Sequence, residues 1–211
     1  KNIFNCDVLH IHDLAGVIDF KNLIETIPEN LPIVWTILDM NPFTGGCHYS
    51  HGCNKFELNC GACPILCSED ENDLSKKIWK MKNKILDKLE IKNISLVAIS
   101  NWSKNEIKKS SLMKNFSTAV IPGSVDTNTF MPKERFSIRE SLDIPQESFV
   151  ILFIAENINA KRKGLDSLKK AISGINNKNL FLLTVGSINR LDELNIPFLN
   201  MGYISNDKIL S

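Results

Sequence analysis

Short apolar runs alternate with segments of helical periodicity along most of this chain of 211 residues. Several of these runs are apolar throughout, which is typical of strands buried on both faces of a parallel sheet. The alternation therefore predicts an α/β fold with crossover helices between parallel strands. The expected strands are Asp7–His12, Ile33–Leu38, Leu96–Ser100, Thr118–Ile121, Phe149–Ala155, Leu180–Val185 and Pro197–Gly202.

The longest expected helix runs from Glu69 to Glu90, where Ser68 and Glu71 fit a capping box. Its expected apolar face consists of Leu74, Ile78, Met81, Ile85 and Leu89. Its basic residues include Lys76, Lys77, Lys80, Lys84 and Lys88. A basic helix face of this kind is usually solvated, and the alternative is contact with anionic lipid at a membrane surface or with a phosphate-bearing acceptor.

Two segments interrupt the alternation. Residues 41–67 show no periodicity and carry five of the six cysteines, and a structureless loop of this length needs something else to organise it. Residues 122–148 contain three prolines and one short helical stretch at Ile138–Leu142. These breaks predict a partial N-terminal domain over residues 1–122 with a Cys-rich loop at 41–67, an interdomain passage over 123–148 and a partial C-terminal domain over 149–211.

Composition and charge exclude several classes of protein. The 25 Lys and Arg residues balance 24 Asp and Glu, so the net charge of +1 does not indicate nucleic acid as a partner. The longest apolar run, Phe149–Ala155, is too short to span a bilayer, and the first residues lack the order of a signal peptide. We therefore expect a cytoplasmic protein. Because the chain begins beside a strand and ends at the start of a helix, we also expect an internal fragment.

Four cysteines form the strongest candidate site, namely Cys47, Cys53, Cys60 and Cys63. A C-x2-C pair with Gly61 inside it lets two thiolates reach one metal, and two further thiolates complete a tetrahedral shell. We expect structural zinc, with an iron–sulfur cluster as the second choice. The alternatives are free thiols or a disulfide, and a disulfide requires an oxidising compartment that nothing in the sequence indicates.

Two histidines and the two remaining cysteines are weaker candidates as metal ligands. His48 and His51 lie between the first two cysteines and can replace a thiolate, although a lone loop histidine is more often solvated. Cys67 follows the C-x2-C pair by four residues. Cys6 lies beside an expected strand, and we expect it to be a small core residue.

A cationic run, Lys161, Arg162 and Lys163, precedes Gly164 and an expected helix. Cations at a helix N-terminus oppose the macrodipole, and local rules of this kind are broken mainly at functional sites. An anion bound here would be held by helix N–H groups and basic side chains beyond the carboxyl end of a strand. The alternative is a solvated basic turn. Neither G-x-G-x-x-G nor a P-loop motif is present.

The Cys-rich segment resembles the first-domain segment of family-4-type retaining glycosyltransferases of the colanic-acid and exopolysaccharide kind. The matching residues are Trp35, Thr36, Asp39, Met40, Phe43, Thr44, Gly45, Gly46, Cys47, His48, Tyr49, Cys53, Cys60, Gly61, Cys63 and Pro64. Residues 96–104 and 121–132 are similar to that family's last strand–helix step and its interdomain passage. Residues 149–172 are similar to the start of its nucleotide-binding domain, and the likeness extends from about Asp7 to Ser211.

The resemblance implies the GT-B architecture, in which two Rossmann-like domains face a cleft; both are incomplete here. It implies transfer of a sugar, with retention, from a nucleoside-diphosphate sugar to a saccharide or lipid-linked saccharide acceptor. Such a reaction belongs to bacterial polysaccharide biosynthesis, in the cytoplasm or at the inner face of the membrane. Lys163, with Arg162 as helper, matches the residues that neutralise the departing donor diphosphate. No catalytic metal is expected, so a metal on the cysteines is expected to be structural.

The chain departs from the family's pattern at three points. The family's histidine before Asp39 is Leu38 here, and leucine cannot form hydrogen bonds or carry a proton, so only Asp39 is left as a weak catalytic candidate. The family's Asn-Gly in the interdomain passage is Gly123-Ser124. The chain also starts after the family's Gly-rich first loop and stops before its Glu-x7-Glu element, whereas two complete domains need roughly 300 residues. We therefore expect the fragment alone to be inactive.

Two other functions stay open. The first is a catalytically inactive sugar-nucleotide-binding or scaffold protein of the same fold, which Leu38 favours. The second is a different α/β enzyme, such as a nucleotide-sugar epimerase. The donor base, the sugar and the acceptor are not specified by the sequence.

Overall fold

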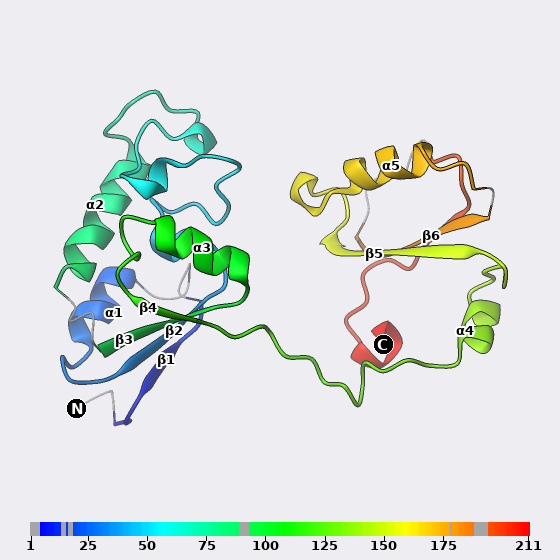
Figure 1. The fold of residues 1–211 in the computed structure, drawn as a ribbon, viewed down its shortest axis with the longest axis horizontal. Coiled ribbons are helices and arrows are strands. Elements are labelled where there is room, and N and C mark those ends of the chain that lie inside the picture. Colours follow the sequence, from blue (N-terminus) through cyan, green and yellow to red (C-terminus); the bar gives the residue numbers. More distant parts are fainter. Residues whose placement is uncertain (1–4, 14–15, 17–18, 89–92, 178, 188–193) are drawn as a thin grey trace. The chain divides into compact units, whose positions relative to one another are not determined.

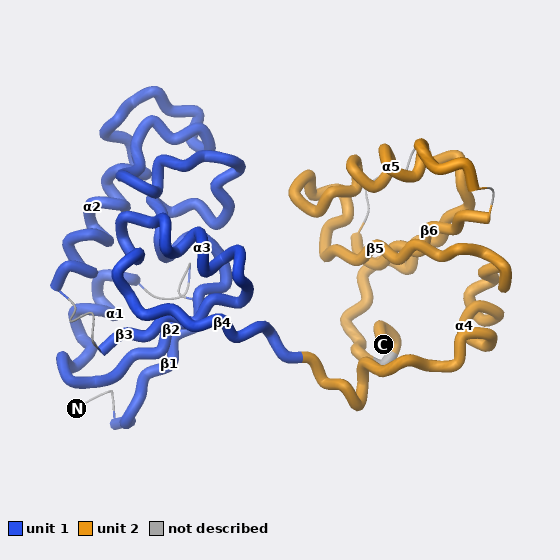
Figure 2. The backbone as a smooth tube through the Cα atoms, viewed as in Figure 1, with its two compact units in different colours: residues 1–124 blue, residues 125–211 orange. Residues whose placement is uncertain are grey.

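The computed structural model describes residues 5–13, 16, 19–88, 93–177, 179–187 and 194–211. The chain divides into two compact units, residues 1–124 and residues 125–211 (Figure 2). The boundary lies near the start of the expected passage over 123–148. The rest of that passage, with helix α4 (Arg135–Ser141), is part of the second unit.

The first unit contains a parallel sheet of four strands in the order β1-β2-β3-β4. The strands are β1 (Leu9–Ile11), β2 (Ile33–Ile37), β3 (Ile94–Ala98) and β4 (Ser117–Val120). The helices between them are α1 (Phe20–Thr26), α2 (Leu74–Leu86) and α3 (Asn101–Lys109). Each strand lies beside its predecessor, and right-handed crossovers then put all three helices on one face of the sheet (Figure 1). The predicted α/β class with parallel strands is confirmed.

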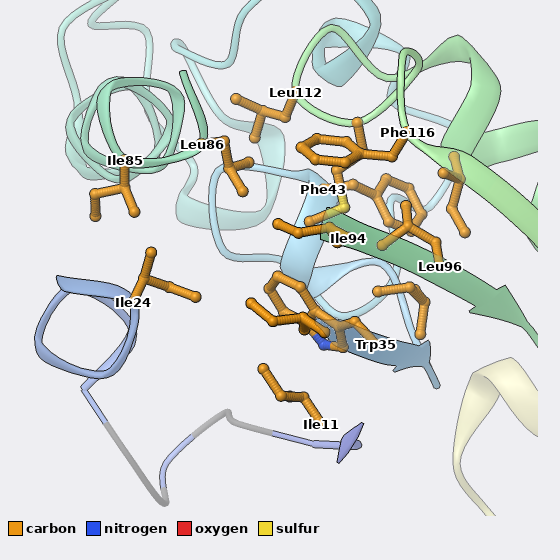
Figure 3. Close-up of a cluster of buried hydrophobic side chains, with 14 of the residues drawn as sticks. Ile11, Ile24, Trp35, Phe43, Ile85, Leu86, Ile94, Leu96, Leu112 and Phe116 are labelled. Carbon is orange, nitrogen blue, oxygen red and sulfur yellow. The ribbon is translucent and has the colours of Figure 1, made fainter. Parts of the chain in front are cut away.

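Alternate residues of the central strands form the core between the sheet and the helices (Figure 3). Because side chains alternate across a strand, these residues share one face of the sheet. Trp35 of β2 is 1% exposed, and its ring centroid lies 5.6 Å from that of Phe20 in α1. The strand and helix residues of this cluster include Ile33, Ile37, Ile94, Leu96, Ala98, Ile24, Ile85, Leu86 and Ile107.

Helix α2 begins later than predicted. Asp73 is its N-cap, because the Asp73 carboxylate accepts a hydrogen bond from the Lys76 N–H at 3.1 Å. Residues 68–72 are not helical, so the predicted capping box of Ser68 and Glu71 is wrong. The predicted end of the helix at Glu90 lies outside the described residues.

The buried face of α2 is also rotated relative to the prediction. Leu74 is 58% exposed, whereas Ser75, Lys82, Ile85 and Leu86 are buried. Leu89 of the predicted face lies outside the described residues. A lysine therefore occupies a core-facing position on this helix.

The second unit contains a parallel sheet of three strands in the order β5-β6-β7. The strands are β5 (Phe149–Asn157), β6 (Leu180–Ser187) and β7 (Phe198–Asn200). Helix α5 (Leu165–Ser173) connects β5 to β6, and α6 (Asp207–Leu210) follows β7. One buried cluster of this unit consists of Ala155, Ile158 and Leu165 with Phe153 packed against it, while Ile154 is 51% exposed.

We predict that the second unit depends strongly on Ile158. This side chain has no exposed surface, so Ile158→Ala should leave a cavity and lower the free energy of unfolding by about 2–5 kcal/mol. The matched control is Ile154→Ala, which truncates an exposed isoleucine four residues earlier and should cost less than about 1 kcal/mol. Hydrogen exchange of the β5 and β6 amides measures both effects. Equal loss of protection in the two variants would contradict this account of the core.

Candidate metal centre

The Cys-rich loop leaves the carboxyl end of β2 and leads into α2. It contains three short 3-10 turns, η1 (Asn41–Phe43), η2 (Lys55–Glu57) and η3 (Pro64–Leu66). Phe43 and Phe56 are buried in the core of the first unit, with their ring centroids 5.9 Å apart in an edge-to-face arrangement. The Ser110 hydroxyl donates to the Phe43 carbonyl at 2.8 Å, and the Ser111 hydroxyl donates to the Phe56 carbonyl at 3.1 Å. The loop is thus attached to the domain at two aromatic residues.

The structure brings the four predicted metal ligands to one cavity. Cys47, Cys53, Cys60 and Cys63 all line a cavity of about 180 Å³ that also borders the first turns of α2. All four are free thiols, and no disulfide links them in this structure. Within the described part of the chain, no group of three or more His, Cys, Asp or Glu side chains is arranged to hold a metal ion as it stands. Metal binding by these cysteines therefore stays a prediction.

The other two cysteines lie apart from this cavity. Cys67 is exposed and does not line it. Cys6 is exposed as well, so the prediction that it is a core residue is wrong. The reason is that β1 begins at Leu9 rather than at Asp7, which leaves Cys6 outside the packed strand.

Two glycines allow the loop to close around the cavity. A Cβ atom on Gly45 would lie 2.7 Å from Cys60 Cβ and 3.0 Å from Cys60 Sγ. A Cβ atom on Gly61 would lie 2.5 Å from the Glu71 carbonyl oxygen, and Gly61 has a φ of +145°. Only glycine, which lacks a Cβ atom, allows neighbouring atoms to lie this close at both positions, and only glycine readily adopts the φ of Gly61. The described residues that line the cavity include four cysteines and no His, Asp or Glu, and this set suits a thiophilic cation such as zinc.

Hydrogen bonds orient the two cysteines of the C-x2-C pair. The Gly45 N–H donates to Cys60 Sγ at 3.1 Å. The Cys63 N–H donates to Asp73 Oδ2 at 2.8 Å, while Asp73 Oδ1 accepts from the Ser75 hydroxyl at 2.6 Å. The hydrogen bonds that Asp73 accepts from the Ser75 hydroxyl and from the N–H groups of Cys63 and Lys76 hold the pKa of its carboxyl well below its usual range. One carboxylate therefore both caps α2 and holds the backbone of Cys63.

Burial raises the pKa of the Cys60 thiol to about 11, and neighbouring thiols add to this effect. Burial also raises the pKa of the Cys47 thiol. Both sulfurs are therefore protonated at neutral pH in the absence of a cation. Because metals bind the thiolate form, binding of a divalent cation has to release these protons.

Two lysines contact the backbone of the loop. Lys55 Nζ donates to the carbonyls of Gly61 at 3.0 Å and Ala62 at 3.1 Å, and it lies 3.6 Å from a Glu71 carboxylate oxygen. Lys82 of α2 is only 4% exposed, and burial lowers its pKa to about 8. The sequence prediction named five other lysines of this segment and missed Lys82. Its spacing from Ile78 and Ile85, four and three residues away, is the sequence signal that places it on the apolar stripe.

The catalytic candidate Asp39 and the preceding residue Leu38 lie at the carboxyl end of β2. Leu38 is 47% exposed there. Asp39 Oδ1 accepts from the Asn41 N–H at 2.8 Å, and Asp39 Oδ2 lies 2.5 Å from His48 Nδ1. Neither His48 nor His51 lines the cysteine cavity, so neither is placed as a substitute ligand. The structure instead pairs His48 with Asp39.

The cationic run lies in the second unit, beyond the carboxyl end of β5. Lys161, Arg162 and Lys163 form a 3-10 turn, η5, which precedes α5. Gly164 follows in the left-handed conformation with a φ of +86° and is the N-cap of α5 without a side-chain cap. The side chains of Arg162 and Lys163 are exposed. The cations therefore lie one turn before the helix rather than in its first turn.

Comparison of the chain with protein-family models and with curated proteins gives no match in either case. Among the described helices, none has the length and apolar character needed to cross a membrane.

We predict that Gly61 is required for the geometry of the cysteine loop. Gly61→Ala should lower the free energy of unfolding of the first unit by about 3 kcal/mol, because backbone strain and overlap with the Glu71 carbonyl act together. The matched control is Gly52→Ala in the same loop, where φ is +86° but no atom lies within 4 Å of the added Cβ, so that only about 1 kcal/mol of strain is expected.

Urea unfolding followed by tryptophan fluorescence reports on this unit alone, because Trp35, Trp79 and Trp102 all belong to it. Equal costs for the two substitutions would show that the close approach at Gly61 does not matter.

Proposed function

We propose that this chain belongs to a retaining glycosyltransferase that transfers a sugar from a nucleoside-diphosphate sugar to a saccharide or lipid-linked saccharide acceptor. The observation that carries the proposal is the position of Arg162 and Lys163 beyond the carboxyl end of a parallel strand and directly before a helix. Open α/β sheets bind their ligands at this edge, and a helix N-terminus favours a phosphate group. Exposed cations add charge-assisted hydrogen bonds to a diphosphate.

Two parallel α/β units in one chain agree with this proposal. The resemblance of the Cys-rich segment to family-4-type glycosyltransferases supports it independently of the cationic run. In such an enzyme, Arg162 and Lys163 stabilise the negative charge that develops on the leaving diphosphate, and this electrostatic role needs no catalytic metal.

We further propose that Cys47, Cys53, Cys60 and Cys63 hold a structural zinc ion. Bound zinc would join the four cysteines and so stabilise a loop that has no periodic apolar face of its own. The hydrogen bonds of Gly45 and Asp73 to the C-x2-C pair support this assignment. An iron–sulfur cluster is the second choice for the same donor set.

A catalytically inactive sugar-nucleotide-binding protein is the second candidate function. Leu38, which lies exposed at the carboxyl end of β2 where the family has histidine, favours it. The two candidates differ in one observable. Both bind the donor nucleotide, but only the enzyme releases nucleoside diphosphate when the full-length protein is given nucleotide sugar and acceptor.

We predict that the cationic run binds the donor diphosphate. Titration of the protein with UDP, GDP and ADP should identify one nucleotide that binds, and Lys163→Ala or Arg162→Ala should weaken that binding about tenfold or more through the loss of a charged hydrogen bond. Lys170→Ala at the other end of α5 is the matched control, because this lysine is equally exposed but lies in the last turn. Unchanged affinity in both test variants would remove the donor-site assignment.

We also predict that purified protein contains about one equivalent of zinc per chain. Cys60→Ser should reduce the zinc content sharply and lower the melting temperature of the first unit, because a ligand is lost. The control is Cys67→Ser, since this exposed cysteine does not line the cavity and its loss should leave the zinc content unchanged. Metal analysis that finds neither zinc nor iron in the wild-type protein would refute the metal site.

A further inference from the structure

Lys82 of α2 contacts the segment of the loop that leads to Cys47. Its ammonium group donates hydrogen bonds to the Asn41 carbonyl at 2.5 Å, to Asn41 Oδ1 at 3.3 Å and to the Thr44 carbonyl at 3.2 Å. The next residue, Gly45, donates its N–H to Cys60 Sγ. The Thr44 hydroxyl donates to the Cys47 carbonyl at 3.0 Å. Lys82 is therefore connected through one short backbone segment to two of the four cavity cysteines.

Within the described residues, no carboxylate lies at ion-pair distance from Lys82. The ion pairs found in the described residues are His48–Asp39, Lys55–Glu71 and Lys109–Glu106, and none of them includes Lys82. All three of its hydrogen-bond acceptors are neutral. Burial of an ammonium group among neutral acceptors is costly, because such acceptors replace only part of its hydration. A buried cation of this kind indicates that negative charge is present nearby in the functional state.

Asp39 and the cysteines of the cavity are the groups that can provide this charge, because the Asp39 carboxylate and thiolates at Cys47 and Cys60 each favour the charged form of Lys82. Four thiolates around one divalent cation keep a net negative charge, whereas four thiols have none. Metal binding by the cysteines would therefore add negative charge that acts on Lys82, beyond that of Asp39.

We infer that Lys82 is the internal counter-cation of the cysteine cluster: it stabilises the net negative charge of the metal-bound thiolates and so acts as a positioning residue for that site. The inference rests on the proposed metal site and adds to it a residue that is not a ligand. It separates two roles for Lys82. As a counter-cation, Lys82 sets the affinity for the metal, whereas as a simple link between α2 and the loop it affects only the stability of the fold.

The test uses the whole 211-residue protein with Zn²⁺ as the probe and a chromophoric chelator as competitor. Lys82→Gln keeps a hydrogen-bond donor for the loop carbonyls but removes the charge, and Lys82→Met removes both. We expect each variant to bind Zn²⁺ about ten- to hundredfold more weakly than the wild type, as is typical for loss of an outer-shell group. The matched control is Lys84→Gln, which removes an exposed charge two residues along the same helix and should leave the affinity unchanged.

Urea unfolding of the metal-free and the Zn²⁺-bound proteins provides the second readout. A counter-cation predicts that the variants lose more stability in the Zn²⁺-bound form than in the metal-free form. Equal losses in both forms with wild-type Zn²⁺ affinity would overturn the inference while leaving the metal site intact. Variants that fail to fold even with saturating Zn²⁺ would also overturn it, because Lys82 would then serve the fold as a whole. Absence of Zn²⁺ binding by the wild type would instead refute the metal site itself, and the inference with it.

Discussion

The arrangement of the first unit follows from one constraint, the parallel order of its strands. Because β1 to β4 lie side by side in chain order, every crossover helix lies on one face and every strand-to-helix loop leaves from the same edge of the sheet. The Cys-rich loop between β2 and α2 is by far the longest of these loops. The parallel sheet therefore fixes both ends of this loop, and its interior has to be organised by other contacts.

Those contacts are of three physical kinds. Phe43 and Phe56 attach the loop to the hydrophobic core, where their burial is favourable. Asp73 joins the start of α2 to the backbone of Cys63 through hydrogen bonds to its carboxylate. The third contact is made by the buried ammonium group of Lys82, which donates to the carbonyls of Asn41 and Thr44. Burial is unfavourable for the charge of this ammonium group and for the charge of a thiolate at Cys60. Metal binding would offset both costs at once.

Sequence periodicity predicted the strands well because parallel strands buried on both faces are continuous apolar runs, as in Leu180–Leu183 of β6. It failed at α2, where Ser68 and Glu71 satisfied a local pattern but Asp73 provided the cap that also holds Cys63. It also missed Lys82, because a lysine within a helix is assigned to the solvent side unless its position on the apolar stripe is checked. The gathering of the four cysteines around one cavity was predictable from their spacing, whereas the pairing of His48 with Asp39 depends on how the loop returns to β2.

The central claim is that the cavity of the first unit is a thiolate site for zinc. X-ray absorption spectroscopy at the zinc edge of the purified protein tests this claim most directly, because it reports the type and distance of the atoms bound to the metal. The account predicts a first shell of sulfur alone, with zinc–sulfur distances of about 2.3 Å and no nitrogen or oxygen ligand. A first shell that contains imidazole nitrogen or carboxylate oxygen would contradict it, since His48, His51 and Asp39 do not line the cavity.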